Sequence, residues 1–151
     1  MVISAIKTMT QKVLWKDRDV IIIDMPPGTG DTQLTFVQEV KINGAIIVST
    51  PQDLALLDVK RGIQMFEKTG VKILGLIDNM SIFKGDDGQE YKIFGEGGVK
   101  KTAKEFNKEF LGHLPLNKDL RISADDGEPL TYSKPDHEIS KLFKSIAEKI
   151  K

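Results

Sequence analysis

Short apolar runs alternate along this chain with segments whose apolar residues recur every three or four positions. The runs are rich in Val and Ile and are bounded by turn residues, so they predict four strands, at 20–24, 45–50, 71–78 and 110–114. The periodic segments predict six helices, at 2–15, 31–40, 53–68, 98–106, 118–124 and 139–150.

The run Val20–Ile23 indicates the fold class. Four consecutive β-branched residues favour a strand buried on both faces, which is typical of a parallel sheet covered by helices. Strands and helices alternate along the rest of the chain, and Gly70 is placed to end the long helix. This order predicts one α/β domain over residues 1–151, with a doubly wound, mainly parallel sheet and helices on both faces.

A polar turn interrupts this alternation after the third predicted strand. Residues 84–88 (Lys-Gly-Asp-Asp-Gly) lie between apolar residues at 82–83 and at 91–94. This pattern predicts a small hairpin inserted near residues 82–94. The next segment, Gly95–Gly98, opens a helix, and its glycines allow either an anion cradle or tight packing. Its place after a hairpin favours packing.

Composition excludes several kinds of site. The chain has 22 Lys and Arg against 22 Asp and Glu, so no net field attracts it to nucleic acid or to a membrane. It has no cysteine, which rules out a disulfide, a thiol nucleophile or a thiolate-ligated cluster made by these residues alone. We expect His113 to be a structural residue within an apolar run and His137 to cap the last helix. The sequence shows neither an apolar run long enough to span a membrane nor a signal peptide, so we expect the protein to be located in the cytoplasm.

Candidate chemistry begins at Asp24, where the first predicted strand ends. A carboxylate in that position can hold the water shell of Mg²⁺ beside a nucleotide phosphate; the alternative is a turn or capping aspartate. The next residues are Pro26-Pro27-Gly28-Thr29-Gly30-Asp31, in which glycines let the backbone approach a phosphate and the following helix start supplies amide donors. Asp31 alternatively serves only as the N-cap of that helix.

Polar residues also follow the second and third predicted strands. They are Thr50–Asp53 and Asn79, and Pro115–Leu116 follows the fourth strand at the same rim. Because the carboxyl ends of parallel strands meet at one edge, these residues predict a nucleotide site there. For Asn79, an ordinary turn asparagine is an equally good interpretation.

The motifs together resemble the Mrp/ApbC family, which consists of deviant-Walker P-loop ATPases of the ParA/MinD class that carry iron–sulfur clusters to apoproteins. The resemblance rests on residues 22–35 (IIDMPPGTGDTQLT), 49–58 (STPQDLALLD), 79–83 (NMSIF) and 93–98 (IFGEGG). It implies that Asp24 is the catalytic Walker B-type aspartate and contacts Mg²⁺ through water. It also implies that a switch facing the γ-phosphate of ATP is formed by Pro26, Gly28, Thr29, Gly30 and Asp31. It further implies contacts near the adenine base, made by Asn79, Pro115 and Leu116.

Two departures from the family pattern limit what this chain can do. The sequence contains no Gly-rich phosphate loop with Lys and Ser/Thr, so at least one βαβ unit of about 30 residues is missing relative to the family. The strand at 20–24 would then lie at an open apolar edge, which invites pairing with another chain. The family's Cys-x-x-Cys pair is replaced by residues 83–91, where Asp86, Asp87 and Gln89 are poor substitutes for thiolates.

The leading hypothesis is therefore the C-terminal part of an Mrp/ApbC-like ATPase, lacking the Walker A segment and binding ATP or a cluster weakly on its own. The resemblance implies that the whole protein hydrolyses ATP as a homodimer and serves apo iron–sulfur client proteins, without nucleic acid or membrane. A second hypothesis is a non-catalytic remnant or interaction module of the same fold. A third is a MinD/ParA-type positioning ATPase, which would need a membrane helix or a basic DNA-binding patch.

Overall fold

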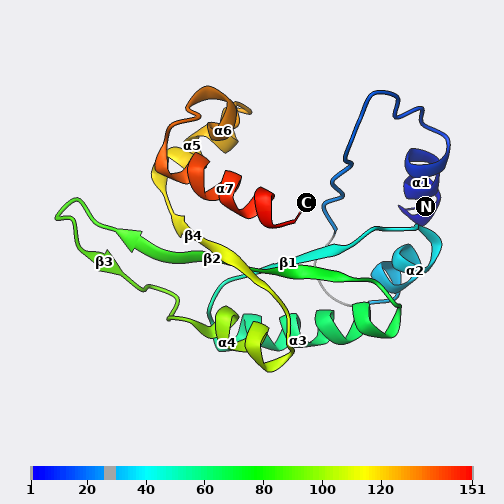
Figure 1. The fold of residues 1–151 in the computed structure, drawn as a ribbon, viewed down its shortest axis with the longest axis horizontal. Coiled ribbons are helices and arrows are strands. Elements are labelled where there is room, and N and C mark those ends of the chain that lie inside the picture. Colours follow the sequence, from blue (N-terminus) through cyan, green and yellow to red (C-terminus); the bar gives the residue numbers. More distant parts are fainter. Residues whose placement is uncertain (1, 26–29, 151) are drawn as a thin grey trace.

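The structure is a computed structural model that describes residues 2–25 and 30–150 (Figure 1). Its strands form one sheet in which β1 and β4 pair in parallel with the central β2, and β3 pairs antiparallel with the end of β2. The elements are α1 Val2–Gln11, α2 Asp31–Glu39, β1 Ala45–Ser49, α3 Asp53–Lys68, β2 Ile73–Lys84, β3 Glu90–Tyr91, α4 Gly98–Glu105, β4 Phe110–Leu116, α5 Lys118–Asp125, α6 Leu130–Ser133 and α7 Glu138–Lys149.

Helices cover both faces of the sheet, so the predicted doubly wound α/β fold is confirmed (Figure 1). On one face, β2 packs against α3 and α4 through a cluster of buried apolar side chains: Leu56, Val59, Ile63, Leu76, Val99 and Ala103. On the other face, β2 and β4 pack against α7 through Ile77, Leu111, Leu114 and Ile146. Successive residues of β2, Leu76 and Ile77, therefore point into different cores, as the alternation of a strand requires.

The long helix α3 ends as its sequence predicts. Gly70 follows the C-cap Thr69 with φ of 72°, a left-handed conformation that glycine adopts without steric cost. The amide of Val71 then donates to the carbonyl of Phe66 at 2.9 Å, which satisfies one of the last helical acceptors. This turn leads the chain directly into β2.

The predicted hairpin near 82–94 is present and projects from the body of the molecule (Figure 1). Phe83 pairs with Tyr91 and Lys84 with Glu90. In its turn, Asp87 accepts hydrogen bonds from the amide of Gln89 at 2.9 Å and from the hydroxyl of Tyr91 at 2.8 Å. The Gln89 amide, and then the Tyr91 hydroxyl, lower the pKa of Asp87, while donation to Asp87 raises the pKa of Tyr91.

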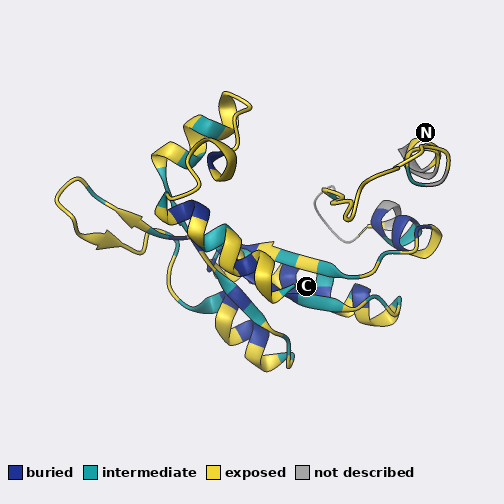
Figure 2. Cartoon of the chain, turned by 45° about the horizontal axis from the view of Figure 1, so that its top comes forward, coloured by how far each residue is buried: buried dark blue, intermediate teal, exposed yellow. Residues whose placement is uncertain are grey.

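The predicted strand at 20–24 is wrong. Residues 20–25 have no regular secondary structure, and the side chains of Val20 and Ile22 are 74% and 91% exposed (Figure 2). A strand forms only where a neighbour supplies its backbone hydrogen bonds, and among the described strands β1 pairs with β2 alone. The apolar run has the composition of a strand but no partner within the described residues.

Several boundaries also differ from the prediction. The first helix ends at Gln11 rather than near Trp15, and Gly30, not Asp31, is the N-cap of α2. The strands β2 and β4 continue to Lys84 and Leu116, while β1 is only partly buried, with exposed Ile46 and Val48.

The two predictions about histidine had opposite outcomes. His137 caps α7, because its Nδ1 accepts a hydrogen bond from the amide of Ile139 at 3.2 Å. His113, expected as a structural residue, is exposed on β4.

A buried carboxylate lies in the central strand. The side chain of Asp78 is 5% exposed, and its Oδ1 has no hydrogen-bond partner among the described residues. Burial raises the pKa of Asp78, and the nearby His113 partly offsets this effect. A raised pKa in the folded state means that folding disfavours the ionised form, so Asp78 lowers the stability of the fold once the pH exceeds the ordinary pKa of a carboxyl group.

The close contact at the start of α4 can be tested by adding a methyl group. A Cβ at Gly98 would lie 2.6 Å from the carbonyl oxygen of Pro51, whereas a Cβ at Gly62 in α3 would meet nothing within 4 Å. We expect Gly98→Ala to lower the free energy of unfolding by about 1–3 kcal/mol, measured by urea denaturation. The control Gly62→Ala should raise it by about 0.5–1 kcal/mol, and equal effects of the two substitutions would contradict the packing role of Gly98.

The cost of burying Asp78 can be tested by its pH dependence. Asp78→Asn should raise the free energy of unfolding at pH 7 by roughly 1 kcal/mol because it removes a charge from the interior. The gain should shrink as the pH falls toward 4, since the parent carboxyl group then becomes neutral. Urea denaturation at both pH values measures this, with Asp86→Asn in the exposed turn as control; a gain independent of pH would show that charge burial is not the cause.

Candidate functional site

The carboxyl ends of three parallel strands form the edge at which the sequence places its site. Residue pairing across the sheet sets Asp78 of β2 opposite Ser49 of β1 and opposite His113 of β4. Thr50 follows β1, and its hydroxyl donates to the side-chain carbonyl of Gln52 at 3.2 Å. Polar residues of three parallel strands therefore lie side by side here, although only Thr50 and Gln52 among them were predicted from the sequence.

The structure brings Asn79 and the Pro115–Leu116 segment together. Asn79 is half-buried and pairs with Leu114, the residue immediately before Pro115. Nearby, the hydroxyl of Ser81 donates to the carbonyl of Leu114 at 3.3 Å. Because β2 continues past Asn79, this asparagine lies within a strand and not in a turn, which removes the turn interpretation.

Asp24 is exposed and lies outside the sheet, so the described residues do not place it at a strand end. The next residue, Met25, packs against the cluster formed by α2 and α3, which contains Phe36, Val37, Val40 and Phe66. Asp24 therefore directly precedes a residue that is packed against the body of the molecule. Of the predicted switch residues, Pro26, Gly28 and Thr29 lie outside the described residues.

Helix α2 begins without a side-chain cap. Gly30 is the N-cap with φ of −76° and ψ of 179°, and its carbonyl accepts from the amides of Gln33 and Leu34 at 3.1 Å. The N-cap makes no side-chain hydrogen bond to the first turn, as glycine has no side chain. Backbone amides at such a helix start suit an anion. Asp31 is the first residue of α2.

The glycine segment before α4 serves packing. A Cβ at Gly98 would meet Pro51 and Leu56, and a Cβ at Gly95 would lie 3.9 Å from the carbonyl oxygen of Pro51. The segment Gly95–Gly98 thus lies against the residues that follow β1. The close approach at Gly98 requires the absence of a side chain, which favours the packing interpretation.

The described residues do not form a metal-cluster site. No group of three or more His, Cys, Asp or Glu side chains gathers in the parts of the chain that the structure describes. The hairpin that replaces the expected cysteine pair instead uses Asp87 in its own turn. None of the helices at 2–25 and 30–150 is long and apolar enough to cross a membrane.

Asp78 is the residue at this edge that sequence reasoning missed. The available signal was the same one that singled out Asp24, namely a carboxylate at the end of an apolar run, here Ile73–Ile77. The predicted strand at 71–78 ends with Asp78 itself, and the motifs assign a role only to the next residue, Asn79. In the structure, Asp78 is more deeply buried than Asn79.

Comparison with known proteins identifies relatives that are named as iron–sulfur proteins. The chain is 43% identical over 147 residues to an iron-sulfur cluster carrier protein of Escherichia coli, covering 97% of this chain and 40% of that protein. It is 44% identical over 151 residues to an iron-sulfur protein required for NADH dehydrogenase in Arabidopsis thaliana mitochondria, covering 99% of this chain and 48% of the relative. The chain thus spans less than half the length of these two relatives.

Solved structures support the same fold. A nucleotide-binding protein of Archaeoglobus fulgidus, solved in complex with ADP, matches 94% of this chain and 58% of its own, with 35% identity and a TM-score of 0.79. The cell division ATPase MinD of Pyrococcus furiosus matches 99% of this chain and 56% of its own with a TM-score of 0.69, and at 23% identity that likeness concerns the fold alone.

The relatives favour the carrier hypothesis over the positioning-ATPase hypothesis, because those with 43–44% identity are named as iron–sulfur proteins while MinD shares only the fold. The family model described as "ParA: NUBPL iron-transfer P-loop NTPase" matches residues 1–151. The chain therefore belongs to the NUBPL-type iron-transfer P-loop NTPase family.

Proposed function

We propose that the complete protein is a nucleotide-dependent iron–sulfur cluster carrier, and that this chain supplies the part of its nucleotide site that senses the γ-phosphate and holds the base. The observation that carries this proposal is the family match over all 151 residues, a range that includes the segment Pro26–Asp31 and Asn79. The family model's own description names an iron-transfer P-loop NTPase.

The proposed roles are those that the family resemblance implies, and residue chemistry supports them. Asp24 orders the water shell of Mg²⁺, and the residues from Pro26 to Asp31 face the γ-phosphate across the start of α2. Amides at that helix start, left without a side-chain acceptor at the N-cap, support the phosphate role. The pairing of Asn79 beside Pro115 and Leu116 supports a contact with the adenine base. Bound ATP–Mg²⁺ would supply the phosphoryl group for hydrolysis.

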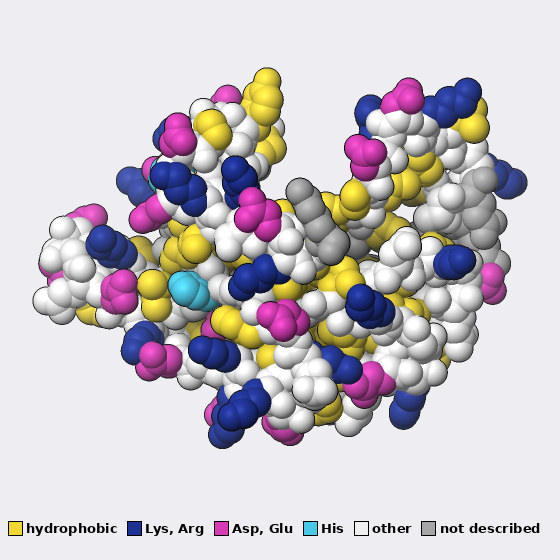
Figure 3. Space-filling view, in the orientation of Figure 1, with side chains coloured by type: hydrophobic (Ala, Val, Ile, Leu, Met, Phe, Trp, Pro, Cys, Tyr) yellow, Lys and Arg dark blue, Asp and Glu magenta, His cyan; other side chains and the backbone are white. Residues whose placement is uncertain are grey.

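These residues make up only part of a nucleotide site. The 151 residues contain no Gly-rich phosphate loop, and Asp24 does not lie at the sheet edge. Hydrophobic side chains line the hollow between the N-terminal segment and α7 (Figure 3). Among the described apolar residues, Ile22 and Val48 are 91% and 55% exposed. We propose that a chain segment outside these residues covers this apolar surface, pairs with the run at 20–24 and brings the phosphate loop.

The iron–sulfur cluster is the cargo in this proposal, and the donor set of this chain does not fit it. Without a cysteine, these residues offer no thiolate to an iron atom. Cluster ligands would have to come from other residues of the complete protein, which we propose acts as a homodimer on apo iron–sulfur clients in the cytoplasm. The single-domain organisation of residues 1–151 is part of the same proposal.

A second candidate function is a non-catalytic interaction module of the same fold. The missing phosphate loop and the missing cysteines favour it for the chain on its own. The two candidates differ in whether nucleotide binding appears once the rest of a family member is present.

Nucleotide binding separates these candidates. We expect isothermal titration calorimetry to show Mg-ATP binding to this chain at least about a hundredfold weaker than micromolar, since the phosphate loop is absent. Adding the portion of the E. coli relative that lies outside the match should restore micromolar binding and turnover. Micromolar binding by the chain alone would refute the partial-site proposal, and no binding after addition would favour the interaction module.

A substitution at Asp24 tests its proposed role in the reconstituted protein, with a substitution at Asp58 as the control. Asp24→Asn should reduce the Mg-dependent turnover of the reconstituted protein by at least about a hundredfold, whereas Asp58→Asn, an exposed carboxylate paired with Arg61, should not change it. Unchanged turnover in Asp24→Asn would rule out the proposed role.

The exposed apolar run offers an independent test of the proposed covering segment. Ile22→Asp should change the free energy of unfolding of this chain by less than about 0.5 kcal/mol, because the side chain is exposed. The fully buried control Ile63→Ala should cost about 2–5 kcal/mol. In the reconstituted protein, Ile22→Asp should weaken association at least about tenfold by burying a charge, measured by analytical ultracentrifugation; equal association would show that the run stays exposed.

A further inference from the structure

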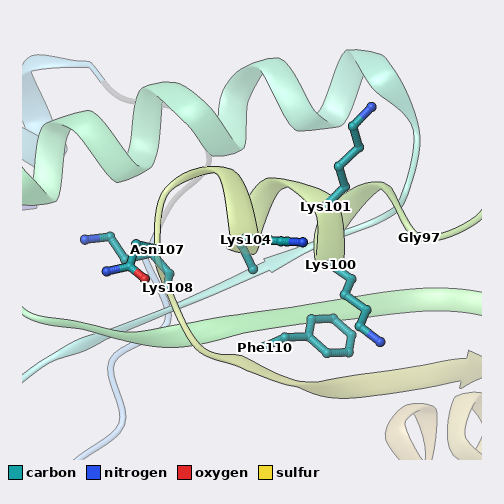
Figure 4. A pocket seen from close by; sticks show the side chains of 8 residues that line it. Gly97, Lys100, Lys101, Lys104, Asn107, Lys108 and Phe110 are labelled. Carbon is teal, nitrogen blue, oxygen red and sulfur yellow. The ribbon is translucent and has the colours of Figure 1, made fainter.

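A groove rich in lysine runs along α4, away from the residues assigned to the nucleotide. It has a volume of 560 Å³ and is lined by α4 and by the start of β4, with Gly97, Lys100, Lys101, Ala103, Lys104, Asn107, Lys108 and Phe110. Figure 4 shows Lys100 beside Phe110 and Lys108 at the far end of α4. Its floor is apolar and its walls carry ammonium groups.

The lysines of α4 are not neutralised within the described residues. Lys108 pairs with Glu67 at 2.7 Å, and Glu105, the one acidic residue of α4, pairs with Lys60 at 2.9 Å. Lys100, Lys101 and Lys104 form no ion pair in the part of the chain that the structure describes. Three positive charges therefore remain on one short helix of a chain whose formal net charge is zero.

This arrangement costs stability in the free protein. Lys100 and Lys104 are four residues apart, so they are neighbours on the helix and repel one another. The first turn of α4 has no acidic residue, and lysines close to it oppose the helix dipole. An acidic partner would relieve both effects.

We propose that this groove is a docking surface for an acidic segment of a partner protein, with carboxylates beside Lys100 and Lys104 and an apolar side chain against Phe110. Phe110 is half-buried and Lys100 Nζ lies 5.9 Å from the centre of its ring, so the two sites are adjacent. Charge complementarity of this kind directs association and selects the partner. The docking surface goes beyond the proposed carrier function and does not depend on it.

The chemistry of the groove favours a protein segment over a nucleic acid. No arginine lines it, and its single aromatic ring packs against the core, where it cannot stack on successive bases. Next to the groove, Glu67 and Glu105 pair with Lys108 and Lys60, so the unpaired positive charge is confined to the three lysines of α4. A continuous phosphate backbone would extend beyond these lysines, whereas a short segment with a few carboxylates would not.

Fluorescence anisotropy with defined probes tests the proposal on the whole chain. The probes are a labelled peptide of alternating glutamate and leucine, the same peptide with lysine for glutamate, and a single-stranded thymidine oligonucleotide. We expect the acidic peptide to bind, more weakly as salt is added, and the other two not to bind. Failure of the acidic peptide to bind, or tighter binding of the oligonucleotide, would overturn the proposal.

Paired variants assign the binding to α4. The double variant Lys100→Gln/Lys104→Gln should bind the acidic peptide at least about fivefold more weakly, while Lys141→Gln/Lys144→Gln on α7, with the same change in net charge, should bind as the parent does. The melting temperature of the α4 variant should equal or exceed that of the parent, since a repulsion is removed. Equal loss in both variants would show nonspecific attraction, and a lower melting temperature would indicate a structural role; either result contradicts the proposal.

Discussion

The fold depends on the backbone pairing of β2 with strands on both of its sides. This strand joins β1 and β4 in parallel, buries Leu76 under α3 and α4, and buries Ile77 under α7. Pairing on both edges satisfies its backbone groups without water, which is what allows apolar residues to be buried on both faces. Every polar residue at the candidate edge takes its position from this arrangement.

The same constraint explains why Val20–Ile23 does not behave like Ile73–Ile77, although both runs have the composition of a buried strand. The second run has two neighbours, whereas the first has none among the described strands and stays exposed. Composition records how apolar a segment is, but pairing depends on which other strands are present. Asp24 loses its expected position at the sheet edge for this reason, since a carboxylate is fixed there only when the strand before it is fixed.

Much of the fold could be predicted because its signals are local. The stripe on α3, the stop at Gly70, the cap at His137 and the polar turn of the hairpin each act within a few residues, and each is present. The rim that contains Asn79 and Pro115–Leu116 could also be predicted, from the order of the parallel strands. The exact pairing could not, because it depends on register: Asn79 and Leu114 are 35 positions apart in sequence, and only the β2–β4 register sets them opposite each other. The position of Asp78 at the end of an apolar run is visible in the sequence, but its burial could not be predicted, because burial of a charge depends on tertiary packing.

Helix α4 connects the two surfaces that the chain presents. Its first residue, Gly98, lies against Pro51 just beyond the carboxyl end of β1, while its other end leads through Asn107 to the start of β4. The lysine groove follows this helix along its length, so a partner bound there would contact an element that is packed directly on the candidate nucleotide edge. At Gly98 the backbone of α4 approaches Pro51 so closely that an added Cβ would lie 2.6 Å from the Pro51 carbonyl oxygen. The two surfaces are thus chemically distinct, but both include residues of one packed helix.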